Sequence, residues 1–380
     1  MDMIKKCDYS KPCGSCVYQG VEYSEQLDIK QDYVNGLLAK FCKVNDIIGA
    51  ENPYYYRNKV HAAFGYQKGN VLAGTYQANT HKLVSIENCQ IENETAGAII
   101  QDIKKMIKSF KLKIYDENTG EGFLRRVLIR TGHSTGQVLV VLVVSSTMFP
   151  SKNNFVKELR RLHPEITSIV MNINNKKTSM ILGDKEFVLY GKGFIEDVLC
   201  GKRFKISPKS FYQINPVQTE ILYNKAIEYA NLSGKERVMD AYCGIGTIGI
   251  IASDKAKEVI GVELNTDAIR DARSNAKTNN VKNINFYNAD AGEFMLQLAS
   301  NKEKIDVVLM DPPRAGSDEV FLKSVVTLSP EKVVYVSCNP ETLARDLQYL
   351  TNKGYKTKAI QPVDMFPFTE HVECVCYLTK

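Results

Sequence analysis

One stretch of the sequence decides the predicted fold: Arg237-Val-Met-Asp-Ala-Tyr-Cys-Gly-Ile-Gly246. Its first residues have the composition of a buried strand, its glycines form a turn, and the residues that follow begin a helix. Glycines at such a turn let the backbone approach a ligand closely. The pattern predicts the first strand, turn and helix of a Rossmann-like α/β sheet.

Four further strands are predicted after this one, at residues 259–263, 284–289, 306–310 and 332–336. The tail, residues 364–378, pairs a turn with an apolar terminal strand and is typical of an antiparallel last hairpin. Ligands of an open α/β sheet bind where its parallel strands end. The side chains expected at or just after the strand ends are Glu263, Asp290, Asp311 and Cys338.

The glycine turn favours a nucleotide-like cofactor. NAD enzymes share Gly-x-Gly, but the third glycine of the dinucleotide fingerprint is displaced here, with Thr247-Ile-Gly249 following instead. The form Asp-x-x-x-Gly-x-Gly, with Asp240, Gly244 and Gly246, fits S-adenosyl-L-methionine better. Glu263 follows the two glycines by 17 to 19 residues, near the spacing at which an acid binds ribose hydroxyls.

Cys338 lies where the predicted strand 332–336 must end, because Pro340 has no N–H for the sheet. A lone cysteine is more often a small buried hydrophobe than a nucleophile. Glu370, His371 and Glu373 lie at the start of the terminal strand. An acid there either keeps a sheet edge soluble or serves as a general base beside Cys338.

Cysteines also cluster near the N-terminus, as Cys-x5-Cys-x2-Cys with a fourth cysteine much later in the chain: Cys7, Cys13, Cys16 and Cys89. Four thiolates suit zinc or a [4Fe–4S] cluster. Three clustered cysteines with one distant partner favour the iron–sulfur cluster, with zinc and unmetallated cysteines as alternatives. A fully ligated cluster has no open iron for substrate, which indicates a structural role.

The totals place the chain among ordinary globular proteins, with 44% apolar and 24% charged residues in 380. No apolar run approaches the roughly 18 residues of a membrane span, and the first residues lack a signal peptide's apolar core. We therefore expect a cytoplasmic protein without membrane contact. Its ten cysteines then indicate metal binding or catalysis rather than disulfides.

The charge is uneven along the chain. Residues 1–205 hold 29 Lys and Arg against 21 Asp and Glu, whereas residues 206–380 hold 20 against 22. A basic half favours a polyanion as partner. Aromatic and basic residues are interleaved at 54–59, 123–126 and 202–205, a pattern that suits stacking on bases and contact with phosphates. Half-buried tyrosines beside solvated charges are the alternative.

We predict two domains, residues 1–205 with a mixed α+β fold and residues 206–380 with the Rossmann-like fold. The first half has helical spacing at 21–41 and 93–110, and alternating runs typical of strands at 59–66, 70–77, 82–86, 123–131, 137–145, 168–174 and 186–190. The apolar residues of the first helix are Leu27, Val34, Leu37, Leu38 and Phe41. This helix either joins the basic domain or docks on the second half.

Six motifs occur in one order across nearly the whole chain, and together they resemble those of the RNA 5-methyluridine (uracil-C5) methyltransferases. They are Cys-x5-Cys-x2-Cys, Phe211-Tyr-Gln-Ile-Asn215, Asp240-Ala-Tyr-Cys-Gly244, Asp311-Pro-Pro-Arg-Ala-Gly316, Ser337-Cys-Asn-Pro340 and Phe366-Pro-x-Thr-x-His-Val-Glu373. The resemblance implies a class I S-adenosylmethionine-dependent catalytic domain behind an iron–sulfur and RNA-binding domain.

The resemblance also implies roles for single residues. Cys338 is the implied nucleophile and Glu373 the implied base, and the four cysteines above are the implied ligands of a [4Fe–4S] cluster. We expect the cofactor site to be formed by Gln213, Asp240, Tyr242, Gly244, Gly246, Thr247, Glu263, Asp290 and Asp311. Many relatives carry asparagine where this chain has Thr247. The sequence begins directly at the cysteines, as in the shorter branch without a TRAM domain, which methylates large-subunit (23S) ribosomal RNA.

Other functions remain open at this stage. They are methylation of uracil C5 in transfer RNA, methylation of an amino group in ribosomal RNA, and RNA binding without catalysis. Amino-methyltransferases place an aromatic residue after the acid–proline motif, whereas this chain has Arg314, and they need no thiol on the fifth strand. A protein without catalysis has no need to keep Cys338 and Glu373 together. We expect a monomer.

Overall fold

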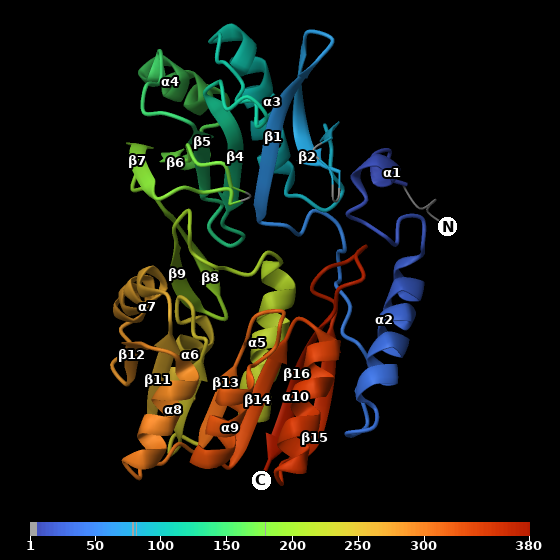
Figure 1. The fold of residues 1–380 in the computed structure, drawn as a ribbon, viewed down its shortest axis with the longest axis vertical. Helices are drawn as coiled ribbons and strands as arrows, with labels where there is room; N and C mark the ends of the chain where they lie inside the picture. The colour runs from blue at the N-terminus through green and yellow to red at the C-terminus, as the bar shows by residue number, and fades with distance from the viewer. Residues whose placement is uncertain (1–5, 78–79, 81, 179) are drawn as a thin grey trace. The chain divides into compact units, whose positions relative to one another are not determined.

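The computed structural model of the protein describes residues 6–77, 80, 82–178 and 180–380, which form two compact units (Figure 1). The first unit takes in residues up to 20, residues 52–198 and residues 205–209. The second takes in residues 21–51, 199–204 and 210–380. The segment 21–51 therefore belongs to the second unit, although it precedes most of the first along the chain. No helix among the described residues is long and apolar enough to cross a membrane.

The first unit is built on a seven-stranded sheet in the order β3-β2-β1-β4-β5-β6-β7. Its strands are β1 (Lys59–Gln67), β2 (Asn70–Tyr76), β3 (Leu83–Ser85), β4 (Leu124–Thr131), β5 (Val138–Val144), β6 (Ile166–Ile173) and β7 (Lys185–Tyr190). Only the β5–β6 pair of this sheet is parallel. The strands predicted from alternation in residues 59–190 are confirmed.

Three helices accompany this sheet: α1 (Ser10–Cys13), α3 (Glu94–Ser109) and α4 (Lys152–Leu162). α3 begins at the cap residue Asn93, whose side chain accepts a hydrogen bond from the Ala96 N–H. Its buried isoleucines, Ile99, Ile100, Ile103 and Ile107, belong to one apolar core with β4 and β5. A short two-stranded sheet, β8 (Ile195–Leu199) and β9 (Lys202–Ile206), completes this part of the chain.

The second unit contains the predicted Rossmann-like sheet, in the order β12-β11-β10-β13-β14-β16-β15. Its strands are β10 (Arg237–Ala241), β11 (Glu258–Glu263), β12 (Ile284–Asn288), β13 (Val307–Met310), β14 (Lys332–Ser337), β15 (Lys356–Val363) and β16 (Glu373–Thr379). The five strands from β12 to β14 are parallel, and β16 runs antiparallel to both of its neighbours. The expected antiparallel last hairpin is thus confirmed.

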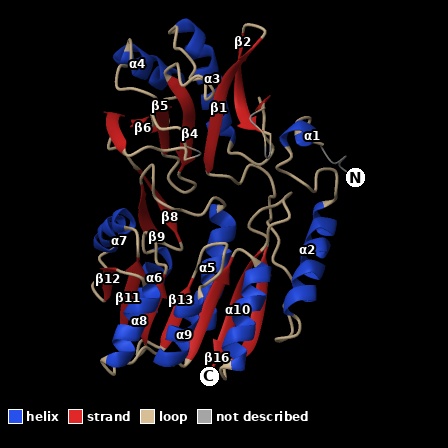
Figure 2. Ribbon diagram, viewed as in Figure 1, coloured by secondary structure: helices blue, strands red, loops and turns tan. Residues whose placement is uncertain are grey.

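Helices alternate with the parallel strands, as Figure 2 shows. The helices of this unit are α2 (Tyr23–Leu38), α5 (Pro216–Ala230), α6 (Thr247–Ala252), α7 (Thr266–Thr278), α8 (Ala291–Ser300), α9 (Glu319–Leu328) and α10 (Pro340–Asn352), with a 3-10 turn at Ser253–Lys255, and α6 to α9 are those that lie between successive parallel strands. Two of them, α5 and α10, begin with proline after an asparagine cap. Both boundaries fall next to residues singled out in the sequence.

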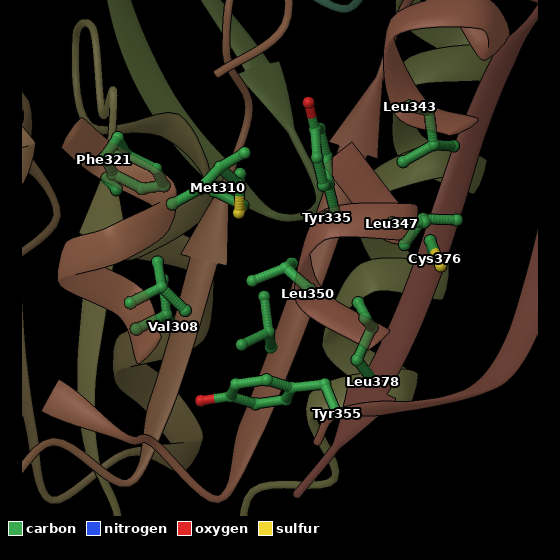
Figure 3. Close-up of a cluster of buried hydrophobic side chains, with 14 of the residues drawn as sticks. Val308, Met310, Phe321, Tyr335, Leu343, Leu347, Leu350, Tyr355, Cys376 and Leu378 are labelled. Atoms are coloured by element: carbon green, nitrogen blue, oxygen red, sulfur yellow. The ribbon is translucent and has the colours of Figure 1, made fainter. Parts of the chain in front are cut away.

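The core of the second unit joins the sheet to α2, α8, α9 and α10. Figure 3 shows part of it, with Met310 of β13 near Phe321 of α9, and Leu347 of α10 near Cys376 of β16. Val34 and Leu38 of α2 belong to the same core. Helix α2 thus packs as part of this unit. The strands whose ends carry the candidate residues are packed in the same apolar core.

Candidate active site

Cys338 and Glu373 meet at the carboxyl end of the parallel strands. β14 ends at Ser337, so Cys338 follows the strand directly, and β16 begins at Glu373. The two strands are antiparallel with Ser337 opposite Cys374, so the start of β16 lies beside the end of β14. The charge of Glu373 is accordingly one cause of the raised pKa of Cys338.

The backbone on both sides of Cys338 is held by its polar neighbours. Ser337 Oγ donates a hydrogen bond to the Asn339 carbonyl oxygen (3.1 Å). The Asn339 side chain accepts from the Glu341 N–H (3.0 Å) and so caps α10. Its Nδ2 donates to the Arg314 carbonyl oxygen (3.2 Å), which ties this turn to the loop after β13. A strand end, a helix cap and this link therefore fix the position of the thiol.

The thiol and the carboxyl group both hold their protons more tightly than in water. Burial, with Glu373 and Asp311 adding to it, raises the pKa of Cys338 to about 11, while the Arg314 guanidinium acts in the opposite direction. Burial and Asp311 also raise the pKa of Glu373 to about 8. Glu373 is only 2% exposed, and its Oε2 has no hydrogen-bond partner among the described residues. A carboxyl group that titrates near neutrality is suited to accept and return a proton.

Two aspartates on the neighbouring strands differ in their partners. Burial raises the pKa of Asp240 and of Asp311 to about 7 in each case. The Gly249 N–H donates to Asp240 Oδ2 (2.8 Å), so this carboxyl group ties β10 to α6. Asp311 lies directly after β13 and acts electrostatically on Cys338 and Glu373. Asp240 therefore supports the turn, whereas Asp311 belongs to the site itself.

The glycine turn after β10 has the backbone that its sequence predicts. Gly244 and Gly246 have φ values of 53° and 82°, in the left-handed region that favours glycine. A Cβ at Gly246 would lie 2.8 Å from the ring of Phe286. Tyr242 also has a positive φ, 62°, which is uncommon for a non-glycine residue and typical of functional sites.

Carboxylates from the next two strand ends are arranged around this turn. The Gly244 N–H donates to Glu263 Oε2 (3.2 Å), and the Asn265 N–H donates to Glu263 Oε1 (2.8 Å). Asp290 caps α8 by accepting from the Glu293 N–H (3.0 Å). Both carboxylates retain acceptor capacity for a ligand, because an ionised carboxylate has about four lone-pair positions.

Tyr223 of α5 belongs to this site although the sequence did not single it out. Its side chain is buried, and burial together with the charges of Asp311 and Glu373 raises its pKa well above the usual range. Interactions of its hydroxyl with the side chains of Thr247 and Gln213 act in the opposite direction on this pKa. Tyr223 thus joins three of the predicted residues, Gln213, Thr247 and Asp311, into one group.

In the first unit the four predicted cysteines line one cavity of about 90 Å³. Cys7, Cys13 and Cys16 come from the segment around α1, and Cys89 comes from the loop between β3 and α3. The Cys7 N–H donates to Gln19 Oε1 (3.1 Å), which folds this segment back on itself. Among the residues that the structure describes, no three His, Cys, Asp or Glu side chains are already grouped as metal ligands. The cysteines share a cavity without yet converging.

The thiols of this cavity interact electrostatically. Burial raises the pKa of Cys16, with Cys13 and Cys7 adding to it and Arg57 opposing it. Burial and Glu92 raise the pKa of Cys89 to about 12, with a further contribution from Cys16. A cation bound in such a cavity would stabilise the ionised form of the thiols that line it.

A family model, tRNA (Uracil-5-)-methyltransferase, matches residues 22–380. The chain belongs to this family. A curated relative from Clostridium tetani, an uncharacterized RNA methyltransferase, is 43% identical over 377 residues, covering 98% of this chain and 82% of its own. Another from Listeria innocua, also an uncharacterized RNA methyltransferase, is 44% identical over 375 residues with the same coverage of both chains.

A solved structure shows the same fold for a member of the family. It is the tRNA (uracil-54, C5)-methyltransferase of Pyrococcus abyssi in complex with S-adenosyl-L-homocysteine. The TM-score is 0.81 at 31% identity, over 95% of this chain and 84% of that one. The expected uracil-5-methyltransferase family and methyltransferase fold are therefore confirmed, and this protein is a methyltransferase.

The predicted site residues of this uracil-5-methyltransferase family member fall into two groups. Those at the sheet edge of the second unit are Gln213, Asp240, Tyr242, Gly244, Gly246, Thr247, Glu263, Asp290, Asp311, Cys338 and Glu373. Those in the first unit are the four cysteines of the cavity. The ring centroid of Tyr242 lies 4.9 Å from that of Phe321, a core residue that Figure 3 labels.

Proposed function

We propose that this protein transfers a methyl group from S-adenosyl-L-methionine to carbon 5 of a uracil in RNA. The observation that carries the proposal is the placement of Cys338 beside Glu373 at the end of β14, with the glycine turn at the same edge of the sheet. Carbon 5 of uracil is too weak a nucleophile to take a methyl group unaided. A thiol and a base at the carboxyl ends of the strands supply the nucleophile that activates carbon 5 and the group that removes its proton.

In the proposed mechanism the Cys338 thiolate adds to carbon 6 of the uracil and forms a carbon–sulfur bond. The ring then carries an enolate, whose carbon 5 takes the methyl group. Glu373 removes the proton from carbon 5, and elimination breaks the bond to Cys338 and restores the thiolate. When bound, S-adenosylmethionine supplies the electrophilic methyl group and a positive charge, which favours the ionised thiol and carboxylate.

The same proposal assigns the cofactor contacts. Glu263, with both oxygens already oriented by backbone N–H groups, is suited to accept from ribose hydroxyls. Tyr242, Asp290 and Asp311 lie at the strand ends on either side of it. Asp240 is directed at the Gly249 N–H, so we assign it a supporting role. Thr247 and Gln213 close the site through the Tyr223 hydroxyl.

A methylation assay with purified RNA, analysed for 5-methyluridine by mass spectrometry, tests the proposal. We expect no product from Cys338→Ala, and full product from Cys42→Ala, which removes a partly exposed thiol away from the strand ends. Glu373→Gln should stop after methyl transfer and accumulate a covalent protein–RNA species. Methylation by Cys338→Ala would exclude the thiolate mechanism.

The substrate that we propose is 23S ribosomal RNA. Transfer RNA is the second candidate, because the Pyrococcus abyssi neighbour acts on uracil 54 of tRNA. Parallel reactions with unmodified ribosomal RNA and unmodified tRNA separate the two. 5-Methyluridine in tRNA alone would reassign the substrate and leave the chemistry unchanged.

We further propose that the cavity of the first unit holds a [4Fe–4S] cluster on Cys7, Cys13, Cys16 and Cys89. The donor set supports it, because four thiols that line one cavity supply one ligand for each iron. Anaerobic purification followed by iron, sulfide and zinc analysis tests it, with Cys89→Ser expected to lose iron and Cys42→Ala to retain it. A colourless protein that contains zinc would contradict the cluster.

A further inference from the structure

The loop that carries the proposed base is short and starts beside it. Residues 364–372 connect β15 to β16, and Glu373 is the first residue of β16. In the register of the two strands Val363 is paired with Glu373. Asp364 therefore follows the residue directly opposite the base, which places it next to the strand pair that carries Glu373.

One face of α2 binds this loop. The buried residues of α2 recur every four positions, at Gln26, Lys30, Val34 and Leu38. The last two pack in the apolar core, whereas the first two are polar. Lys30 Nζ donates to Asp364 Oδ1 (2.6 Å) and to the Phe366 carbonyl oxygen (3.1 Å). The two polar residues of this stripe, Gln26 and Lys30, thus face the loop, whereas the two apolar residues pack in the core.

Further hydrogen bonds hold the same loop from both sides. The Tyr23 hydroxyl donates to Asp364 Oδ2 (2.8 Å), and Gln26 Oε1 accepts from the Phe368 N–H (3.0 Å). Phe368 has a φ of 67°, a conformation that a bulky residue keeps only when its surroundings impose it. From α5, Gln218 Nε2 donates to the Asp364 carbonyl oxygen (3.0 Å).

The ion pair between Lys30 and Asp364 is poorly explained as a source of stability. Its side chains are 1% and 0% exposed. Removing two charges from water costs about as much as their attraction returns, so an apolar pair of similar size often serves stability as well or better. An apolar residue would also continue the stripe of Val34 and Leu38. What a charged pair adds is a fixed direction, since Lys30 bonds two oxygens of the loop at once.

We propose that Lys30, through Asp364, is a positioning residue for Glu373, and that it acts on the release step of the reaction. The inference rests on the proposed role of Glu373 as the base. We call the hydrogen bonds from Lys30 to Asp364 and to the Phe366 carbonyl oxygen the clamp. Without the clamp the loop retains its apolar contacts, but the carboxyl group of Glu373 is no longer held in a fixed position relative to carbon 5. Addition of Cys338 and methyl transfer then still occur, whereas proton removal and elimination slow.

The test compares Lys30→Met with Val34→Ala, which removes buried contacts one helical turn away without touching the loop. We expect kcat for Lys30→Met to fall about tenfold to a hundredfold, the range in which small misplacements of a catalytic group fall, with KM for RNA little changed. On unsubstituted RNA we expect this variant to accumulate the covalent adduct under denaturing conditions, as Glu373→Gln does. Val34→Ala should lower the melting temperature without accumulating adduct.

A buried charge without its partner threatens folding, so the double variant Lys30→Met/Asp364→Asn is measured alongside. It removes both charges and the clamp together, and we expect it to accumulate adduct as well. If neither folded variant accumulates more adduct than Val34→Ala, the positioning role is wrong. If Glu373→Gln itself accumulates no adduct while the wild type methylates carbon 5, the assignment of the base fails first.

Discussion

Replacing Glu373 by glutamine should make the protein more stable, by an amount that grows with pH. Burial raises the pKa of this carboxyl group from 4.5 to about 8, so the folded protein keeps a proton that the unfolded chain has lost. The stabilisation by the neutral carboxyl group is therefore complete below about pH 4.5 and is lost as the pH rises through about 8. Glutamine does not titrate and escapes this loss.

The difference in the free energy of unfolding between Glu373→Gln and the wild type follows from the titration of Glu373. A full difference of one bound proton is equivalent to about 1.4 kcal/mol per pH unit, so between about pH 5 and about pH 7 the advantage of glutamine should grow by about 2–3 kcal/mol. Urea unfolding of both proteins across this range measures it. Any constant cost of placing an amide at the position cancels in the comparison. A difference that is independent of pH would refute the buried, proton-holding state of Glu373.

Two further substitutions test the cofactor side of the site. Gly246→Ala should destabilise the fold by about 2 kcal/mol, because it forces a side chain into the left-handed region against Phe286, and Gly20→Ala, at a positive φ with open space around it, should cost less in thermal unfolding. Equal losses of stability in the two variants would contradict the close approach of Phe286 to Gly246. Tyr223→Phe removes the hydroxyl bonded by Thr247 and Gln213 and should weaken binding of S-adenosylhomocysteine about tenfold by calorimetry, as expected for a loss of about 1.4 kcal/mol. The control is Tyr229→Phe, because Tyr229 lies on the same helix, α5, and its hydroxyl accepts a hydrogen bond from Asn45. Unchanged binding of S-adenosylhomocysteine by Tyr223→Phe would show that Tyr223 does not belong to the site.

The strand ends could be predicted from sequence because each carries a local signal. Pro340 places the end of β14 just before it, and the glycines of 244–246 place the end of β10. Because β16 runs antiparallel to β14, the terminal strand and the turn before it place Glu373 beside the carboxyl end of β14. The first two signals require only neighbouring residues, whereas the position of Glu373 also depends on the pairing of β16 with β14.

Other features depend on partners that are distant in sequence. The predicted apolar face of the first helix included Leu27, yet the structure buries Gln26 and Lys30. Their partners lie more than 330 residues away, in the loop after β15. Tyr223 was hidden for a similar reason, because its spacing in α5 is that of an ordinary core residue.

One predicted basic patch contains an arginine whose charge is used within the first unit. The sequence groups Arg125 and Arg126 as RNA-contacting residues, but the register of β4 against β5 shifts between Leu124 and Arg126, so Arg125 lies at an irregularity of the strand. Arg125 is buried and pairs with Glu117 (2.6 Å), so its charge is used within the unit. Arg126 is half-buried and lies 5.2 Å from the ring centre of Tyr76.

Cys338 is proposed to form a bond to uracil that, once carbon 5 carries the methyl group, is released by removal of the carbon 5 proton. Ribosomal RNA containing 5-fluorouridine tests it most directly, because fluorine at carbon 5 cannot leave as a cation. Incubated with this RNA and S-adenosylmethionine, the protein should give a retarded band on a denaturing gel, absent for Cys338→Ala and present for Cys42→Ala. A protein that methylates uracil C5 in normal RNA but gives no such band with the fluorinated RNA would contradict the covalent mechanism.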